Sequence, residues 1–349
     1  MILKKISLLL YTLVLLSFDV LSHEVLTKKE VKYLKDGTCI RRDSNQPFSG
    51  VLEIKSNEGI VEMTISYKNG LGNGPITTFY TSGNVKSLGN LNNNNRSGTT
   101  EYYQENGVLK SRSLFRNNLR DGVTEVFYSN GIIKERYNYS NDKPNGKAEI
   151  FYPDGNLMAI GFFKKGLKEG TFTYFYKNGK TKKISKYEND IIHGLAKKFH
   201  ENGFPSSIFS YFNGEVNGIY EIYDKESNLL IQGHNLNGKR QGISNYYYNN
   251  GNLKSSYKYE SGIPHGAYKL YYETGSIKVK GSYFRDLLDG NRKVYYENGN
   301  IKETGYWLKG QKDGLFQFYN DKGHLTKEIT FKDGSIYKVT PNSELAKST

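Results

Sequence analysis

The sequence predicts an all-β protein, an elongated array of β-hairpins with about twelve 24-residue repeats in a twisted meander sheet. Glycines recur every 24 residues from Gly50 to Gly314 without insertion or deletion. Two further series mark turns, and two more are aromatic, at the same spacing. Five registers that stay locked over so many copies exclude chance and are typical of a repeat protein. The anchor glycines are Gly50, Gly74, Gly98, Gly122, Gly146, Gly170, Gly194, Gly218, Gly242, Gly266, Gly290 and Gly314.

Two turns are predicted in each repeat. One series holds glycine from Gly59 to Gly323 and departs only at Ser227. The other holds only Gly, Asn or Asp from Gly70 to Gly334. These three residue types tolerate the positive φ that tight turns require. Strand-like runs between the two turns therefore predict one hairpin per repeat.

The hairpin register follows if Asn178-Gly179 forms a two-residue turn. Counting outward from that turn pairs Gly170 with Tyr187. The same register pairs Gly122 with Tyr139 and Gly290 with Trp307. We expect each aromatic ring to lie over the bare glycine on the neighbouring strand, which stabilises sheets.

The same register places Phe175 across from Lys182 and Phe127 across from Lys134. It therefore predicts one face on which lysines alternate with rings. The candidate binding residues on this face are Lys86, Lys110, Lys134, Lys182, Lys254, Lys278, Lys302, Phe127, Phe175, Tyr247, Tyr271 and Tyr295. A second series that begins at Tyr80 is expected on the opposite, packed face, beside the Leu and Ile residues of the Val85 series.

This face suits an anionic partner, since the net charge is +14 and the pI is near 9.3. A cation beside a ring can bind an anionic polymer, a lipid headgroup or a glycan. The plainer alternative is that the lysine stems cover the rings and keep the sheet soluble.

The ends of the chain lack the repeat. Residues 1–22 are predicted to form a secretory signal peptide, with Lys4 and Lys5 before an apolar run over 6–18. That run is shorter than the roughly 20 residues needed to span a bilayer. Residues 23–49 are expected to cap the array over 50–337, and 338–349 to form a C-terminal tail. Cys39 is the only cysteine, so it is expected to be a plain thiol in the cap.

The export signal predicts an exported protein in the periplasm, at the cell surface or secreted, with no transmembrane span after cleavage. It also disfavours nucleic acid as the partner.

Catalytic patterns are missing from the sequence. There is no P-loop, no G-x-S-x-G and no G-x-G-x-x-G that opens a helix. His193 and His265 share a repeat phase but lie three repeats apart, which is too far to share a metal. Glu101, Glu125 and Glu149 recur once per repeat and are interpreted as a solvated charge row. We therefore expect no enzymatic activity, no cofactor and no metal.

One stretch departs from the pattern, between Pro205 and Asn235. Pro205 replaces Leu or Ile, Asp224 replaces a tyrosine, and Ser227 replaces the turn glycine. This stretch is a kink, a specialised surface or simple sequence drift, and drift is the favoured interpretation.

The unit G-x-x-x-x-[FY]-Y-x-N-G-x-[LI]-K-x-x-x-x-Y-x-[NG]-G, as in residues 290–314, resembles the MORN-repeat variant. MORN stands for membrane occupation and recognition nexus, and the variant occurs in bacterial proteins labelled YwqK-type antitoxins. The resemblance covers residues 50–337. It implies hairpins strung into a long meandering sheet.

Three functions remain open at this point. The first is a non-enzymatic scaffold at the cell envelope that binds a protein partner. The second, implied by the resemblance, is an antitoxin or immunity protein that neutralises a toxin. The third is binding of cell-wall glycan or anionic lipid through the basic, tyrosine-rich surface.

Overall fold

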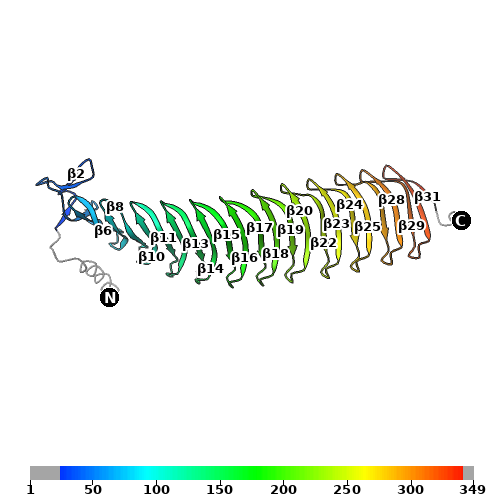
Figure 1. Cartoon of the computed structure of the whole chain (residues 1–349), viewed down its shortest axis with the longest axis horizontal. Coiled ribbons are helices and arrows are strands. Elements are labelled where there is room, and N and C mark those ends of the chain that lie inside the picture. The colour runs from blue at the N-terminus through cyan, green and yellow to red at the C-terminus, as the bar shows by residue number, and fades with distance from the viewer. Residues whose placement is uncertain (1–23, 341–349) are drawn as a thin grey trace. The chain divides into compact units, whose positions relative to one another are not determined.

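The computed structural model describes residues 24–340, and every regular element in that range is a β-strand. The predicted all-β class, with hairpins in chain order, is confirmed (Figure 1). The described chain forms two compact units. Unit 1 holds residues 24–157 and 163–166, and unit 2 holds residues 158–162 and 167–340. The predicted signal peptide and residues 341–349 of the predicted tail lie outside the described residues.

The strands of unit 1 begin with three short elements. From β4 to β13 each main strand pairs antiparallel with the next one. The strands are β1 (Val25–Thr27), β2 (Val31–Tyr33), β3 (Cys39–Arg41), β4 (Gly50–Lys55), β5 (Val61–Lys68), β6 (Leu71–Phe79), β7 (Val85–Asn92), β8 (Asn95–Arg96), β9 (Gly98–Tyr103), β10 (Leu109–Arg116), β11 (Leu119–Phe127), β12 (Ile133–Ser140) and β13 (Lys143–Phe151). Strand β14 (Leu157–Lys164) has residues in both units.

The strands of unit 2 repeat the same antiparallel pairing. They are β15 (Leu167–Phe175), β16 (Thr181–Glu188), β17 (Ile191–Phe199), β18 (Pro205–Phe212), β19 (Glu215–Tyr223), β20 (Leu229–Leu236), β21 (Lys239–Arg240), β22 (Gly242–Tyr247), β23 (Leu253–Glu260), β24 (Ile263–Tyr271), β25 (Ile277–Phe284), β26 (Leu287–Leu288), β27 (Gly290–Tyr295), β28 (Ile301–Leu308), β29 (Gln311–Tyr319), β30 (Leu325–Lys332) and β31 (Ser335–Thr340). Strand β31 runs past Tyr337, where the sequence predicts the end of the array.

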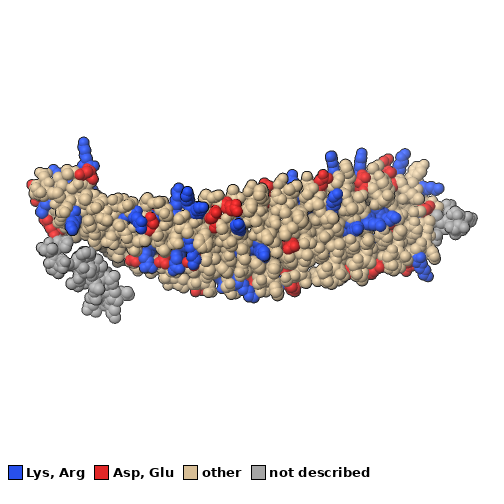
Figure 2. Space-filling model, in the orientation of Figure 1, with Lys and Arg blue, Asp and Glu red and all other residues tan. Residues whose placement is uncertain are grey.

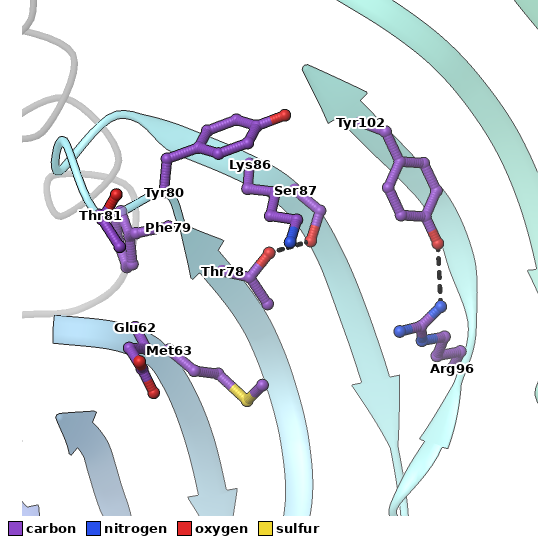
Figure 3. A pocket seen from close by; sticks show the side chains of 10 residues that line it. All are labelled: Glu62, Met63, Thr78, Phe79, Tyr80, Thr81, Lys86, Ser87, Arg96 and Tyr102. Carbon is purple, nitrogen blue, oxygen red and sulfur yellow. Dashed lines mark hydrogen bonds between the residues drawn. The ribbon is translucent and has the colours of Figure 1, made fainter. Parts of the chain in front are cut away.

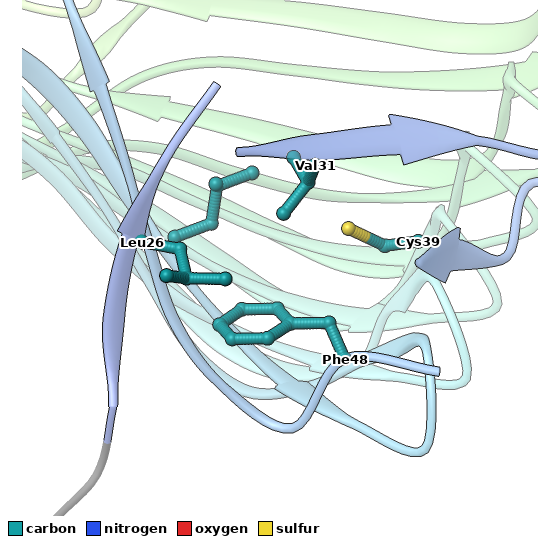
Figure 4. Close-up of a cluster of buried hydrophobic side chains, with 5 residues drawn as sticks. Leu26, Val31, Cys39 and Phe48 are labelled. Carbon is teal, nitrogen blue, oxygen red and sulfur yellow. The ribbon is translucent and has the colours of Figure 1, made fainter. Parts of the chain in front are cut away.

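The segment before Gly50 packs on the first hairpin of unit 1. Strand β1 pairs parallel with β4, so it occupies the edge that β4 would otherwise leave open. Strands β2 and β3 form a small separate hairpin. Leu26, Val31, Cys39 and Phe48 gather in a buried cluster with Leu52 (Figure 4). The Cys39 thiol is free and buried, and burial raises its pKa.

The two turns of each repeat differ in type. Asn189 and Asp190 both have positive φ, at 49° and 68°, between the paired residues Glu188 and Ile191. That geometry is a two-residue type I′ turn. At the other end, the Tyr176 carbonyl accepts from the Gly179 N–H, and the Tyr176 N–H donates to the Lys180 carbonyl. This loop is a longer turn closed by a glycine in the left-handed region.

The turn prediction is therefore correct in position but wrong in length at Asn178-Gly179. The longer loop inserts one residue, and the register shifts by one between Tyr174 and Phe175. Phe175 faces Thr181 instead of Lys182. In unit 1, Phe127 likewise faces Ile133 instead of Lys134.

The anchor glycines keep their predicted partners. Gly170 pairs with Tyr187, and Gly122 with Tyr139. The proposed reason is wrong, however, because a Cβ placed on Gly170 would meet nothing within 4 Å. The backbone explains the glycine instead: Gly170 has a φ of +73°, which L side chains rarely adopt.

The core lies on one face of the sheet, called here the buried face. In unit 2 its buried side chains recur at one repeat phase, as Phe172, Ala196, Tyr220, Ser244, Tyr268 and Phe316. Glycines on the neighbouring strands leave room for the largest of them: a Cβ on Gly305 would overlap the ring of Phe316. Side chains alternate along a strand, so the residues between them point to the opposite, outer face.

The irregular stretch between Pro205 and Asn235 does not interrupt the sheet. Strands β17 to β20 pair continuously, and Gly218 pairs with Asn235 where other copies have a ring. Pro205 opens β18, and the first residue of a strand is a position that tolerates proline. Ser227 keeps the positive φ of the glycine that it replaces, at 71°. The backbone thus supports drift within an unchanged hairpin.

Candidate binding surface

The seven predicted lysines all lie at the surface, beside the longer loops. Lys86, Lys110, Lys134, Lys182, Lys254, Lys278 and Lys302 are exposed. The bulge that the longer loop creates sits at this position, so each of these lysines is displaced from the aromatic residue that the predicted register set opposite it. We call these seven residues the lysine row.

Five lysines of the row each cover a tyrosine ring of the series that begins at Tyr80. The sequence predicts them beside a different series of rings, the one that contains Phe127 and Phe175, and that prediction is wrong on this point. The ammonium groups lie 5.2–5.6 Å from the ring centroids. The pairs are Lys86–Tyr80, Lys182–Tyr176, Lys254–Tyr248, Lys278–Tyr272 and Lys302–Tyr296. Two lysines of the row differ. Gln104 replaces the tyrosine of this series in the copy that contains Lys110, and the Lys134 ammonium lies 3.6 Å from the Glu135 carboxylate.

The covered tyrosines also connect successive repeats. The Tyr176 hydroxyl donates to the Phe199 carbonyl at 2.7 Å, and the Tyr272 hydroxyl to the Tyr295 carbonyl at 2.8 Å. Tyr80, Tyr128, Tyr248 and Tyr296 make the equivalent bond. These rings are therefore structural, and the lysine row presents its ammonium groups above them.

The predicted ring residues lie elsewhere. Phe127, Phe175, Tyr247, Tyr271 and Tyr295 are half-buried. Phe127 lies under the Arg112 guanidinium at 5.9 Å, and Tyr295 under the Lys280 ammonium at 5.4 Å. These ring residues pair across the strands with the Val85 series, as Phe127 does with Ile133. The Val85 series therefore lies on the same face as the rings, and the expectation that it lies on the opposite face is wrong.

The glutamates of unit 1 form an ion-pair ladder on the outer face. Glu125 accepts from Arg112 at 2.9 Å and from Arg136 at 3.0 Å. Arg136 reaches Glu149 at 3.3 Å. The Glu125 side chain is only 13% exposed, so the expectation of a solvated row is wrong. Burial alone would raise the pKa of Glu125, but the two arginines outweigh it and lower the pKa.

Cations also cover rings on the buried face, at a repeat phase that the sequence analysis did not predict to carry them. Arg120 lies 4.1 Å from the Tyr139 ring, and Lys168 lies 5.1 Å from the Tyr187 ring. Arg96, Arg240 and Lys312 make similar contacts. The signal was present in the sequence, since these cations share one repeat phase.

Exposed apolar side chains flank the type I′ turns of unit 2. They are 42–55% exposed, and each of the six turns from Asn189-Asp190 to Lys309-Gly310 carries one or two of them. We call this set the turn-edge row: Ile191, Phe212, Leu236, Ile263, Phe284, Leu287 and Leu308. His193 packs on Phe212 and His265 on Phe284, with ring centroids 5.5 and 5.2 Å apart.

Unit 1 is different at the same positions. It carries mostly polar or charged side chains there, with Leu71 and Leu119 as exceptions, and includes Lys68, Asn92, Asn95, Arg116, Ser140 and Lys143. On the face drawn in Figure 2, charged side chains are dispersed over a surface made mostly of other residues. Exposed apolar side chains are therefore more frequent at these positions in unit 2, where Glu188, Glu215, Lys239, Glu260 and Gln311 hold the others. Clustered exposed apolar side chains can mark interaction sites.

Residues 24–340 contain no group of three His, Cys, Asp or Glu side chains that could hold a metal ion. In the same range, no helix has the length and apolar character needed to cross a bilayer.

The family model described as "MORN repeat variant" matches eight segments, which together make up half of the chain. They are residues 96–117, 120–141, 144–165, 168–189, 240–261, 264–284, 288–309 and 312–333. The gap between 189 and 240 contains the irregular stretch. No curated protein matches the chain.

Among solved structures, one match is a chain of "Crystal Structure of TcdB2-TccC3". It is 10% identical with a TM-score of 0.17, and the alignment covers 91% of this chain and 22% of that chain. A likeness at this score carries no argument.

Proposed function

Because the chain belongs to the MORN-repeat variant family, whose repeats are generally protein- or lipid-binding modules, we propose that it is a non-enzymatic scaffold. We propose further that it is exported and binds a protein partner at the cell envelope. The turn-edge row of unit 2 is the observation that supports a protein partner. Apolar side chains of this size gain most from burial against another apolar surface.

The test is capture of the partner from the envelope of the producing organism with residues 23–349. Apolar contacts persist at high salt, whereas contacts between exposed charges are screened. We expect one protein to be retained at both low and high salt. Replacing Phe212 and Phe284 with Thr keeps β-propensity and should abolish that capture.

The matched control is Val123→Thr, an exposed apolar residue of unit 1 outside the row. It should leave capture unchanged. Equal capture by the double variant and the wild type would remove the turn-edge row from the proposal. A captured protein that proves to be a toxin, neutralised by the chain, would favour the antitoxin alternative.

The lysine row supports a second candidate, binding of an anionic wall polymer or lipid headgroup. Its ammonium groups recur at the repeat spacing, and all are exposed. Replacing Lys134, Lys182, Lys254 and Lys278 with Glu should leave the fold intact and abolish retention on anionic vesicles at low salt. Retention of the wild type that is unchanged by this replacement would exclude the lysine row.

Export has its own test. We expect the protein in the envelope or medium fraction, with His23 as the mature N-terminus. An intact chain that starts at Met1 in the cytosolic fraction would contradict this part of the proposal.

A further inference from the structure

A hollow of about 490 Å³ lies between the first repeats of unit 1 (Figure 3). Met63, Tyr80 and Tyr102 supply carbon surfaces to its wall, and Lys86 and Arg96 supply two cations. Glu62 supplies one carboxylate to the same wall, and it makes no ion pair with either cation within 4 Å. The volume is within the range of small-molecule sites, which are commonly apolar with a few placed polar groups.

The hollow exists because this copy of the repeat carries small side chains. Thr78 and Ser87 line it, and their hydroxyls satisfy each other at 2.6 Å. In unit 2 the same two phases hold a larger pair, Tyr174 and Lys183, which also face each other across neighbouring strands. The wall is thus open in the early repeat as a result of local sequence.

Within residues 24–340, Lys86 has no carboxylate partner, like every other lysine of the lysine row except Lys134. Lys134 lies 3.6 Å from Glu135, the next residue in the chain. Ser87 stands at that place after Lys86, and no carboxylate of the described residues lies within 4 Å of the Lys86 ammonium. The Lys86 charge rests on the Tyr80 ring, at 5.6 Å from its centroid.

Arg96 also lacks a carboxylate partner. Its counterpart Arg120 lies 3.1 Å from the Asp142 carboxylate. Asn118 replaces that aspartate beside Arg96, and its side chain accepts from the Arg96 backbone N–H at 2.7 Å. The Arg96 guanidinium donates to the Tyr102 hydroxyl at 2.9 Å, and no described carboxylate lies within 4 Å of it.

We propose that this hollow binds a small organic anion with a planar, apolar body. The body would lie against Met63, Tyr80 and Tyr102, and its acid group would meet Lys86 and Arg96, the two cations that no described carboxylate approaches within 4 Å. Hydrogen bonds from ionised donors to an anion are about twice as strong as neutral ones. This inference does not depend on the proposed scaffold function.

The probe is 2-naphthoate, and its neutral match is 2-naphthamide. Titration calorimetry on residues 23–349 should show binding of the acid and binding of the amide that is at least about tenfold weaker. Equal affinity for both compounds, or no binding of the acid at millimolar concentration, would overturn the proposal.

Two substitutions neutralise the cations without removing them. Ser87→Glu and Asn118→Asp give Lys86 and Arg96 the carboxylates that Lys134 and Arg120 have. The double variant should remain folded and bind 2-naphthoate at least about tenfold more weakly. Unchanged affinity in the folded double variant would contradict the proposal.

Two controls separate charge from bulk and from position. Ser87→Gln adds the same bulk as Ser87→Glu without its charge, so it should retain more of the affinity than Ser87→Glu does. Ser207→Glu, at the phase of Ser87 but in unit 2, should change nothing. Equal losses of affinity for 2-naphthoate in Ser87→Gln and Ser87→Glu would show that the acid does not recognise the charge of Lys86. Lys86→Gln removes that charge directly and should also weaken binding.

Discussion

Glycine serves two different needs in this protein. Gly170 has a φ of +73° and open space where its Cβ would be, so its backbone conformation requires glycine. Gly305 has no such φ, but a Cβ there would overlap the ring of Phe316, which is fully buried. Replacing glycine is therefore expected to destabilise the protein for a different reason at each of these two positions.

Replacing Gly170 tests the backbone explanation. Gly170→Val should lower the free energy of unfolding by about 1–3 kcal/mol, because a β-branched residue is strained at positive φ. Gly170→Asn should cost clearly less, since asparagine tolerates the left-handed region. Urea unfolding measures both, and equal losses would contradict the explanation.

Gly305 provides the contrasting case. Gly305→Ala should destabilise by crowding the Phe316 ring, and the second substitution Phe316→Leu should recover part of the loss. A loss that Phe316→Leu does not reduce would show that space is not the reason for this glycine.

Glu125 makes the stability of unit 1 depend on pH. The pKa of this carboxyl is lowered in the folded state, so its contribution is present above the unfolded pKa, near 4.5. That contribution is lost as the pH falls through the lower folded value. We expect stability to decline below about pH 5 and Glu125→Gln to weaken that decline while costing about 2 kcal/mol at pH 7.

The matched control is Glu105→Gln, an exposed glutamate of a neighbouring loop. It should leave both the stability at pH 7 and the acid profile unchanged. An acid profile that is identical in Glu125→Gln and the wild type would remove the ion-pair ladder as its cause.

Each hairpin is joined to the next by more than its strand ladder. The Tyr176 hydroxyl donates to the Phe199 carbonyl of the following repeat, and Lys182 covers the same ring. Asp224 replaces this tyrosine in the irregular copy and bonds to its own turn at Asn228 instead. The hydroxyl connection is therefore a property of individual copies, while the strand ladder is common to all.

Tyr176→Phe isolates that hydroxyl. The substitution should lower the free energy of unfolding by about 1 kcal/mol, because the Phe199 carbonyl loses its side-chain donor. Tyr306→Phe, at an exposed ring, should be neutral. Thermal unfolding compares the two, and equal effects would argue against a connecting role.

At the scale of the whole molecule, stability is expected to be a sum over repeats and their contacts. Deleting residues 266–289 removes one 24-residue period and joins equivalent phases. The shortened protein should fold, with a circular dichroism spectrum like that of the parent. Deleting 23 residues from the same place shifts every later side chain to the other face, so it should unfold the C-terminal part.

If the protein shortened by 23 residues unfolds as cooperatively as the protein shortened by 24, the phase of the repeat does not govern the fold. Equal melting temperatures for the two shortened proteins would count against the sum over repeats in the same way.

The sequence by itself determined the repeat, the two turn positions and the pairing of Gly170 with Tyr187. Those features depend on residue type and spacing, and both recur from repeat to repeat along the sequence. It also identified the lysine row, but not the rings that the row covers. The reason is that one extra residue in the longer loop shifts the register beyond Tyr174, and a turn of either length fits the same Asn-Gly signal.

Only the tertiary structure decided which charges are paired and which apolar side chains stay exposed. Glu125 meets two arginines because neighbouring strands place them beside it. The turn-edge row becomes visible when the strands place turns one repeat apart side by side. The two cations of the hollow, Lys86 and Arg96, are brought to one wall by neighbouring strands. Exposure and pairing depend on neighbours across strands, and the spacing along a chain does not specify those contacts until the register is fixed.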